Sequence, residues 1–154
     1  MTKTLKRIFT ITITLCFSLL IVFWLLVIPI GNEIILSGYE KDLKNYDIGC
    51  EYDIIETAKS CGKLYGNGNG MEYLVVSIIK TDENVNENLP TIGDGIFIIR
   101  ADNNEKLDEL LNVNGSIDKI KEKLSNISDQ SKYYILYSLH SADNEIWDLD
   151  FRAH

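Results

Sequence analysis

The sequence predicts an α+β fold, in which an N-terminal transmembrane helix precedes a mainly antiparallel sheet of four or five strands with one or two helices on one face. Three observations lead to this prediction. A long apolar segment opens the chain, several later segments are rich in β-branched residues, and two others carry apolar residues at helical spacing. No β-α-β alternation is long enough to demand a parallel sheet.

The apolar segment covers residues 8–30 and carries no charged side chain. As an α-helix it would reach about 34 Å, which is enough to cross a hydrocarbon core about 30 Å thick. A buried helix of a soluble protein is the alternative, but such a helix rarely continues this far without a polar face. We therefore expect a transmembrane helix whose partner is the lipid bilayer.

Basic residues predict the orientation of this helix. Lys3, Lys6 and Arg7 precede it without any acid, whereas acids and bases are mixed after it. The positive-inside rule places residues 1–7 in the cytoplasm and the rest of the chain outside. The apolar run is too long for a signal peptide and ends without a small-residue cleavage pattern, so a retained anchor is favoured over a cleaved leader.

Charge separates the exported part from the anchor. All 23 acids but only 12 of the 15 bases follow residue 30, which gives the exported part a formal charge of about −11. Such a field repels nucleic acid and anionic lipid headgroups, so we expect neither as a partner of this domain. It favours a cationic protein partner or simply keeps the domain soluble. No motif points to a cofactor.

Two cysteines, Cys50 and Cys61, lie in the part expected outside the cytoplasm, where disulfides persist. If paired, they would close a 12-residue loop, which chain-entropy arithmetic values at about 3 kcal/mol. Their spacing fits no zinc pattern, because no second pair of ligands accompanies them. Two free thiols are the alternative, and the disulfide is favoured.

Residues 31–49 are expected to form a stalk or amphipathic helix, and residues 50–154 the extracytoplasmic α+β domain. Strands are expected at residues 52–58, 71–80, 96–100 and 133–139. The strand at 71–80 is apolar on both faces, which predicts a central position in the sheet. Asn103 and Ser116 are expected to cap two helices that come after them.

The run Gly-Asn-Gly-Asn-Gly at residues 66–70 is the most unusual local feature. Every residue in it tolerates positive φ, so successive backbone N–H groups can point into one concavity, as in anion-binding loops. The run lacks the Gly-Lys-Ser/Thr ending of a phosphate loop, and a strand comes after it rather than a helix. A wide β-hairpin connection is the alternative and is favoured.

The C-terminal segment, residues 138–154, contains both histidines and four carboxylates. Such residues can bind a metal or act as acid and base, but His140 and His154 are 14 residues apart and match no metal signature. A tail docked through Trp147 and Phe151, with Arg152 paired to an acid, is favoured. We therefore expect no metal site.

The block from Cys61 to Tyr73 and the ending Asp150-Phe151-Arg152-Ala153-His154 together resemble a group of small bacterial membrane-anchored proteins of unassigned activity. That group shares a G-x-L-x-G-N-G-N-G-M-x-Y block and an ending similar to D-x-R-[GA]-H. Phe151 departs from the aliphatic residue usual in that ending. The resemblance implies no catalytic role. If the Asn/Gly run and the tail recur together, one interpretation is a shared site in which loop amides and Arg152 face an anionic group. The alternative is that Arg152 and the chain-terminal carboxylate hold the tail on the loop. We therefore predict that Gly68 and Arg152 lie close together.

These observations leave several functions open, and a binding role is favoured over an enzymatic one. The leading hypothesis is a tethered acidic domain that binds a protein or envelope partner, for example as an immunity-type protein that blocks a basic toxin. The alternative is an anion-binding or small-ligand domain, or an enzyme. Its candidate residues are Asn67, Gly68, Asn69, Gly70, Arg152 and His154. A third hypothesis is a subunit of a membrane complex that uses Thr10, Thr12 and Thr14 in helix contacts.

Overall fold

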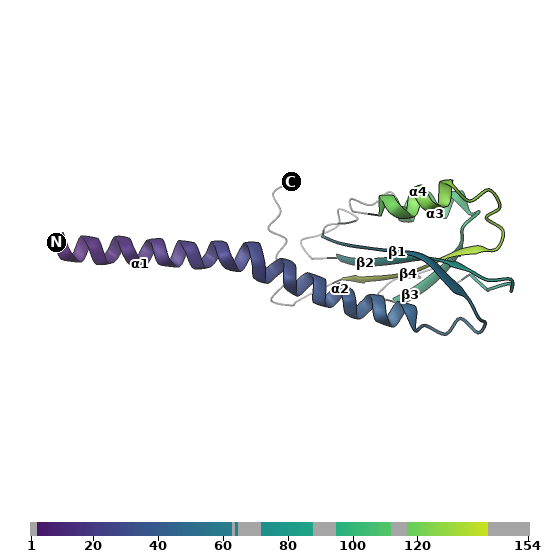
Figure 1. Ribbon diagram of the computed structural model, residues 1–154, viewed down its shortest axis with the longest axis horizontal. Helices are drawn as coiled ribbons and strands as arrows, with labels where there is room; N and C mark the ends of the chain where they lie inside the picture. The colour runs from purple at the N-terminus through teal and green to yellow at the C-terminus, as the bar shows by residue number, and fades with distance from the viewer. Residues whose placement is uncertain (1–2, 63, 65–71, 88–94, 112–116, 142–154) are drawn as a thin grey trace. The chain divides into compact units, whose positions relative to one another are not determined.

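The computed structural model describes residues 3–62, 64, 72–87, 95–111 and 117–141. The chain divides into two compact units, Met1–Ile34 and Ile35–His154. The helices and strands, labelled in Figure 1, are α1 (Lys3–Val22), the π-helix η1 (Phe23–Val27), α2 (Ile28–Lys44), β1 (Asp53–Gly62), β2 (Glu72–Lys80), β3 (Gly95–Arg100), α3 (Asn104–Leu111), α4 (Asp118–Ser125) and β4 (Tyr133–Ser141).

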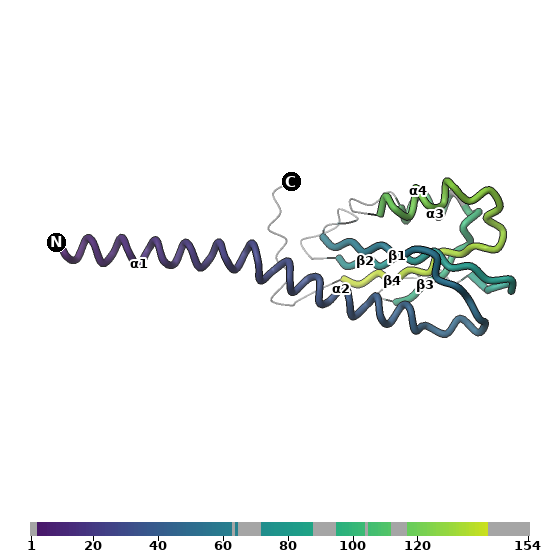
Figure 2. The backbone as a smooth tube through the Cα atoms, viewed as in Figure 1, coloured from purple at the N-terminus to yellow at the C-terminus, as the bar shows by residue number. Residues whose placement is uncertain are grey.

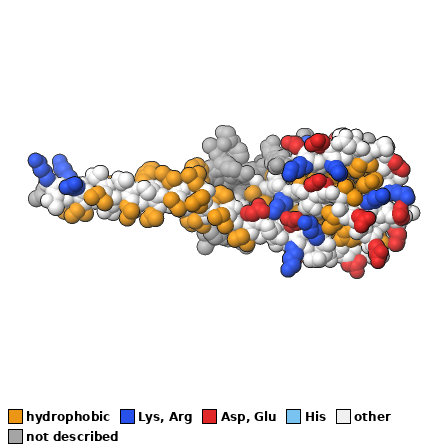
Figure 3. All heavy atoms as spheres, viewed as in Figure 1, with side chains coloured by type: hydrophobic (Ala, Val, Ile, Leu, Met, Phe, Trp, Pro, Cys, Tyr) orange, Lys and Arg blue, Asp and Glu red, His pale blue; other side chains and the backbone are white. Residues whose placement is uncertain are grey.

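The first unit is helical, and its large apolar side chains are exposed. The backbone is helical from Lys3 to Lys44, and this helix is long and apolar enough to cross a membrane (Figure 2). No residue of α1 is buried, and Figure 3 shows hydrophobic side chains along this part of the chain. The helix predicted at residues 8–30 is thus confirmed, and its length and composition fit a membrane span.

Four hydroxyl side chains of α1 are hydrogen-bonded within their own helix. The hydroxyls of Thr10, Thr12, Thr14 and Ser18 each donate to the carbonyl four residues earlier, at 2.9–3.0 Å. A hydroxyl bonded in this way can enter hydrocarbon without an unsatisfied donor. The threonines that the sequence offered for helix contacts are therefore already engaged with their own backbone.

A proline accounts for the π-helical turn η1. Pro29 has no N–H, and its ring would clash with the carbonyl four residues earlier, that of Leu25. The turn before it is widened, so that the N–H of Ile28 donates to the carbonyl of Phe23, five residues back. Such wide turns absorb a proline without ending the helix.

The four strands form one antiparallel sheet in the order β1-β2-β4-β3. The predicted central position of β2 is confirmed, and its residues from Tyr73 to Ile79 are all buried. Gly62 and Glu72 are register partners, so β1 and β2 form a hairpin. The Asn/Gly run at residues 66–70 lies between these two strands in the sequence and outside the described residues.

Two helices cover one face of the sheet, as predicted. Leu107 and Leu110 of α3 and Ile120 and Leu124 of α4 are buried in one cluster with Ile78 of β2. The apolar residues of both helices fall on one side at helical spacing, which explains why the sequence pattern was sufficient to find them.

The last turns of α2 cover the opposite face (Figure 1). Leu36 and Leu43 pack in a second cluster with Tyr73 and Val75 of β2 and Leu136 of β4. The prediction placed helices on one face only, and this part of it needs correction. Central strands that are apolar on both faces require cover on both, and the segment expected as a stalk or amphipathic helix supplies the second layer.

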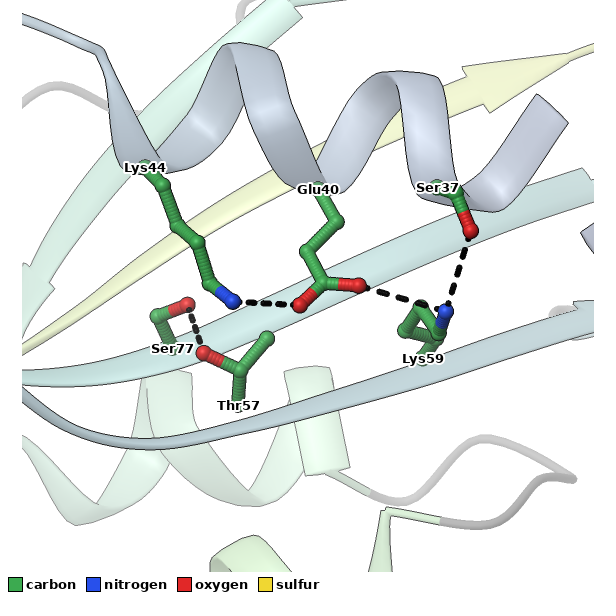
Figure 4. A network of polar contacts seen from close by, with 6 residues as sticks. All are labelled: Ser37, Glu40, Lys44, Thr57, Lys59 and Ser77. Atoms are coloured by element: carbon green, nitrogen blue, oxygen red, sulfur yellow. Dashed lines mark hydrogen bonds and ion pairs between the residues drawn. The ribbon is translucent and has the colours of Figure 1, made fainter. Parts of the chain in front are cut away.

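A polar network joins α2 to strand β1 (Figure 4). One carboxylate oxygen of Glu40 accepts a hydrogen bond from Lys44 at 2.5 Å, and the other lies 3.2 Å from the ammonium of Lys59. Lys59 also donates to the hydroxyl of Ser37 at 3.4 Å. The hydrogen bond from Lys44 is the largest cause that lowers the pKa of Glu40; burial opposes it, and Lys59 lowers the pKa further.

Replacement of Glu40 by glutamine is expected to lower the free energy of unfolding at pH 7 by about 0.5–1 kcal/mol, because solvent screens a partly exposed ion pair. The folded-state pKa lies below the ordinary value of 4.5. The stabilisation is therefore complete above that value and is lost as the pH falls through the folded-state pKa. Urea unfolding of wild type and Glu40→Gln should converge at acidic pH.

The matched control is Glu83→Gln, which removes one exposed carboxylate from the loop after β2. This substitution should leave the unfolding free energy unchanged at both pH values. A difference between wild type and Glu40→Gln that stays constant into the acidic range would contradict the assignment.

Candidate functional site

The candidate ligand residues of the Asn/Gly run and the tail lie outside the described residues. These are Asn67, Gly68, Asn69, Gly70, Arg152 and His154. The closeness of Gly68 and Arg152 therefore stays a prediction. The described residues that flank both segments do show where each segment joins the sheet.

Both segments join the same end of the sheet. Glu72, the first residue of β2, pairs with Gly62 on one side and with Ser141, the last residue of β4, on the other. The N–H of Leu64 donates to the carboxylate of Glu72 at 2.7 Å. The connection between β1 and β2 and the C-terminal segment thus begin at neighbouring positions, although they are far apart in the sequence.

An aromatic stack lies beside this end of the sheet. The ring of His140 is stacked on that of Tyr39 in α2, with centroids 3.8 Å apart and planes 6° apart. Tyr39 also meets Tyr73 of β2 at 6.0 Å in a tilted arrangement. Within the described ranges no group of three or more His, Cys, Asp and Glu side chains could hold a metal ion. The position of His140 is thus one of helix–sheet packing.

The predicted Cys50–Cys61 disulfide is wrong, since neither cysteine is disulfide-bonded. Cys50 precedes β1, and its Sγ lies 3.6 Å from the hydroxyl of Thr81 just after β2. Cys61 pairs with Tyr73 at the other end of the same hairpin. From Asp53 to Cys61 the strand advances by eight residues, which spans about 26 Å between their Cα atoms. A disulfide needs Cα atoms within about 7 Å of each other.

A second candidate site is an open pocket of about 580 Å³ at the opposite end of the β1–β2 hairpin. Its walls come from three segments: residues 44–46 at the end of α2, residues 50–54 at the start of β1, and residues 80–82 at the end of β2. The pocket lies entirely within the second unit.

Local turns position the middle wall of this pocket. The carboxylate of Asp47 accepts a hydrogen bond from the N–H of Gly49 at 2.7 Å, which forms a tight turn after α2. Gly49 has a φ of +84°, a conformation that L side chains rarely adopt. The hydroxyl of Thr81 then donates to the carbonyl of Glu51 at 2.9 Å, so the segment is held against the end of β2.

Tyr52 links two walls of the pocket. Its hydroxyl donates to the carbonyl of Tyr46 at 2.8 Å. Burial is the largest cause that raises the pKa of Tyr52, and the carboxylate of Asp47 raises it further. The hydroxyl therefore stays protonated and remains a donor at neutral pH.

Two of the charged residues at the pocket already have partners. Lys44 is paired with Glu40 at 2.5 Å, as described above. Asp82 lies 2.6 Å from the ammonium of Lys132, and the hydrogen bond from Lys132 lowers the pKa of Asp82. The Lys132–Asp82 pair is solvent-exposed and contributes little to stability, whereas the Lys44–Glu40 pair is partly exposed.

The thiol of Cys50 is among the groups that line this pocket. No histidine is among the described residues that line it. The polar neighbour of the Cys50 thiol is the hydroxyl of Thr81, which is not a base. An activated nucleophile needs a base within hydrogen-bonding reach, and the described lining residues do not place one beside the thiol.

Sequence reasoning missed this pocket. Its three walls carry no shared motif, and each alone reads as the end of an element. The Asp47-x-Gly49 turn was the one local signal, and it indicates a change of direction rather than a site. The chain matches no protein-family model, no curated protein and no solved structure.

Proposed function

We propose that the protein is a single-pass anchor of a bacterial cytoplasmic membrane, whose acidic extracytoplasmic domain binds a cationic protein partner. The distribution of exposed apolar side chains supports this proposal best. Among the described residues, all but two of the exposed large hydrophobic side chains lie between Leu5 and Ile34. This concentration of exposed apolar side chains on the helix supports its placement in lipid.

The surface of the domain supports recognition by charge. A protein that binds through an apolar patch exposes a contiguous hydrophobic area. In the described part of residues 35–141, Tyr46 and Ile54 are the only large hydrophobic side chains that are exposed. Acidic side chains lie among basic ones on the visible face of the domain (Figure 3), and acids outnumber bases in the sequence after residue 30. A field of this sign accelerates encounter with a basic protein and disfavours acidic competitors.

Crosslinking in intact envelopes tests this function. The full-length protein carries an affinity tag at its N-terminus and is treated with a water-soluble carbodiimide, which joins carboxylates directly to lysines. We expect an adduct with a basic envelope protein, which raised salt suppresses because the Debye length falls from about 10 Å at 0.1 M to about 3 Å at 1 M. A toxin in the adduct would support the immunity-type role.

The matched control joins residues 1–34 to an unrelated neutral domain. This control should give no adduct if the partner binds the acidic domain. Recovery of no protein partner from the full-length chain, or of an adduct that 1 M salt leaves unchanged, would contradict the proposed function.

A second candidate function has one specific observation in its favour. Ser138 lies two residues before His140 on β4, is 1% exposed, and its hydroxyl has no hydrogen-bond partner among the described residues. Unsatisfied buried groups are uncommon, and some belong to binding sites. A small-ligand or anion site formed by the Asn/Gly run and the tail would lie at this end of the sheet.

A further inference from the structure

Three basic side chains lie together at the start of α1. Lys3, Lys6 and Arg7 are three and four residues apart in a helical backbone, so they share one face of the helix. All three are exposed, and Figure 3 shows Lys and Arg side chains gathered at this end of the helix. In the described part of the chain no ion pair engages any of them.

The first unit holds no carboxylate near these cations. Its only acid is Glu33, 26 residues after Arg7. The backbone is helical between the two residues, and 26 residues of helix are about 39 Å long. Like charges on one helix face repel one another, and an anion beside them relieves that repulsion. For the first unit, such an anion has to come from another molecule.

The opposite side of the same two helical turns indicates what that molecule is. Leu5, Ile8 and Phe9 fall there by helical spacing, and they are 54%, 57% and 61% exposed. Apolar side chains of this size are stabilised by hydrocarbon, whereas clustered cations at the end of an apolar helix are stabilised by anionic headgroups. Phospholipids with an anionic headgroup supply both environments.

We infer that Lys3, Lys6 and Arg7 bind the phosphodiester of an anionic phospholipid headgroup. The planar guanidinium of Arg7 can donate two parallel hydrogen bonds to two phosphate oxygens, and the two ammonium groups add their charge beside it. Long basic side chains at the end of an apolar helix reach the headgroup region in this way. The inference rests on the proposed function, because it requires that the helix is inserted in lipid.

Spin-labelled lipids test the inference on the full-length protein. The purified chain is reconstituted in phosphatidylcholine vesicles, and flotation after an alkaline carbonate wash establishes that it is inserted. A trace of phosphatidylglycerol or of phosphatidylcholine carries a nitroxide on its acyl chain, and electron paramagnetic resonance measures the fraction that the protein immobilises. We expect the association constant of phosphatidylglycerol to exceed that of phosphatidylcholine at least about fivefold.

Charge variants locate the binding face. Lys3→Gln with Lys6→Gln and Arg7→Gln should reduce the preference for phosphatidylglycerol to less than about twofold. The matched control removes the same charge from the exposed surface of α4 and should change the preference less than about 1.5-fold. Its substitutions are Lys119→Gln, Lys121→Gln and Lys123→Gln. Equal losses in both variants, or no loss in the first, would overturn the inference.

A rearranged variant distinguishes a binding face from diffuse attraction to the membrane. Leu5→Lys with Lys6→Leu, and Arg7→Ile with Ile8→Arg, keep the composition of the helix but move two cations to its other side. The preference should fall at least about twofold below that of wild type, because the phosphate then meets one cation rather than three. An unchanged preference would overturn the face as a site.

The remaining outcomes separate the inference from the proposed function. Removal of the wild-type chain from the vesicles by alkaline carbonate would overturn the membrane span, and the inference with it. An inserted chain without a lipid preference would overturn the inference and leave the span standing. Loss of the preference on addition of inorganic phosphate at constant ionic strength would overturn the lipid headgroup as the ligand.

Discussion

Replacement of Leu43 by alanine is expected to lower the free energy of unfolding of the domain by about 2–5 kcal/mol. Leu43 is fully buried, and it packs between α2 and the sheet with Tyr73, Tyr134 and Leu136. Truncation removes its transfer free energy and leaves a cavity that the surrounding strands cannot close. Urea unfolding of the full-length protein in detergent micelles measures the loss.

The matched control lies on the same helix. Lys41 is exposed, and Lys41→Ala should change the unfolding free energy by less than about 0.5 kcal/mol. If residues 35–44 were a stalk that does not pack on the sheet, both variants would behave alike. Equal, small effects of the two substitutions would therefore refute the two-sided cover of the sheet.

Most of the domain fold could be predicted because its signals are local. The segment that became β2 is β-branched and apolar on both faces, which predicts both its structure and its central position. Asn103 was expected to cap a helix, and its carboxamide oxygen accepts a hydrogen bond from the N–H of Lys106 at 3.4 Å at the start of α3. Ile117 rather than Ser116 is the N-cap of α4.

The sequence separation of Cys50 and Cys61 was not sufficient to predict whether they form a disulfide. The chain-entropy argument assumes that the residues between two cysteines form a flexible loop. The strand was predicted to end at Ala58, which left Cys61 in a segment able to turn back toward Cys50. In the structure β1 continues to Gly62, so Cys61 is part of a rigid extended segment. An error of four residues in a strand boundary was therefore sufficient to reverse the conclusion.

The cover of the second face and the pocket depend on tertiary structure. Leu36 and Leu43 are on one face of α2, but the same pattern occurs in a helix that contacts lipid or another chain. Their burial against β2 and β4 follows only from the sheet. The pocket requires the turn at Gly49 to bring residues 50–54 beside the end of β2. The sequence of each segment, read separately, predicts neither the burial of α2 on the sheet nor the position of residues 50–54 beside β2.

Placing two arginines in the apolar helix should remove the protein from the membrane. Leu15 and Leu19 are each 61% exposed and lie one turn apart on α1. Insertion scales give a cost of about 2.5–3.5 kcal/mol for each arginine near the centre of a span. For Leu15→Arg with Leu19→Arg the total of about 5–7 kcal/mol corresponds to at least a thousandfold shift in partition, since 1.4 kcal/mol is a factor of ten.

Alkaline carbonate extraction measures whether the protein is inserted in the membrane, and external protease digestion measures whether its domain is exported. The wild-type chain should stay in the carbonate-resistant membrane fraction, and its domain should be digested by protease added outside the cytoplasmic membrane. The double arginine variant should be extracted, and its domain should be protected, because a span that fails to insert does not export the domain attached to its C-terminal end.

Leu15→Ala with Leu19→Ala is the matched control, because it shortens the same two side chains without adding charge. This variant should behave as wild type, since a helix of this length stays apolar after the change. Carbonate extraction of the wild-type chain itself would contradict a membrane span. Protection of the wild-type domain from external protease would instead contradict the orientation, and with it any role that depends on a partner outside the cytoplasm.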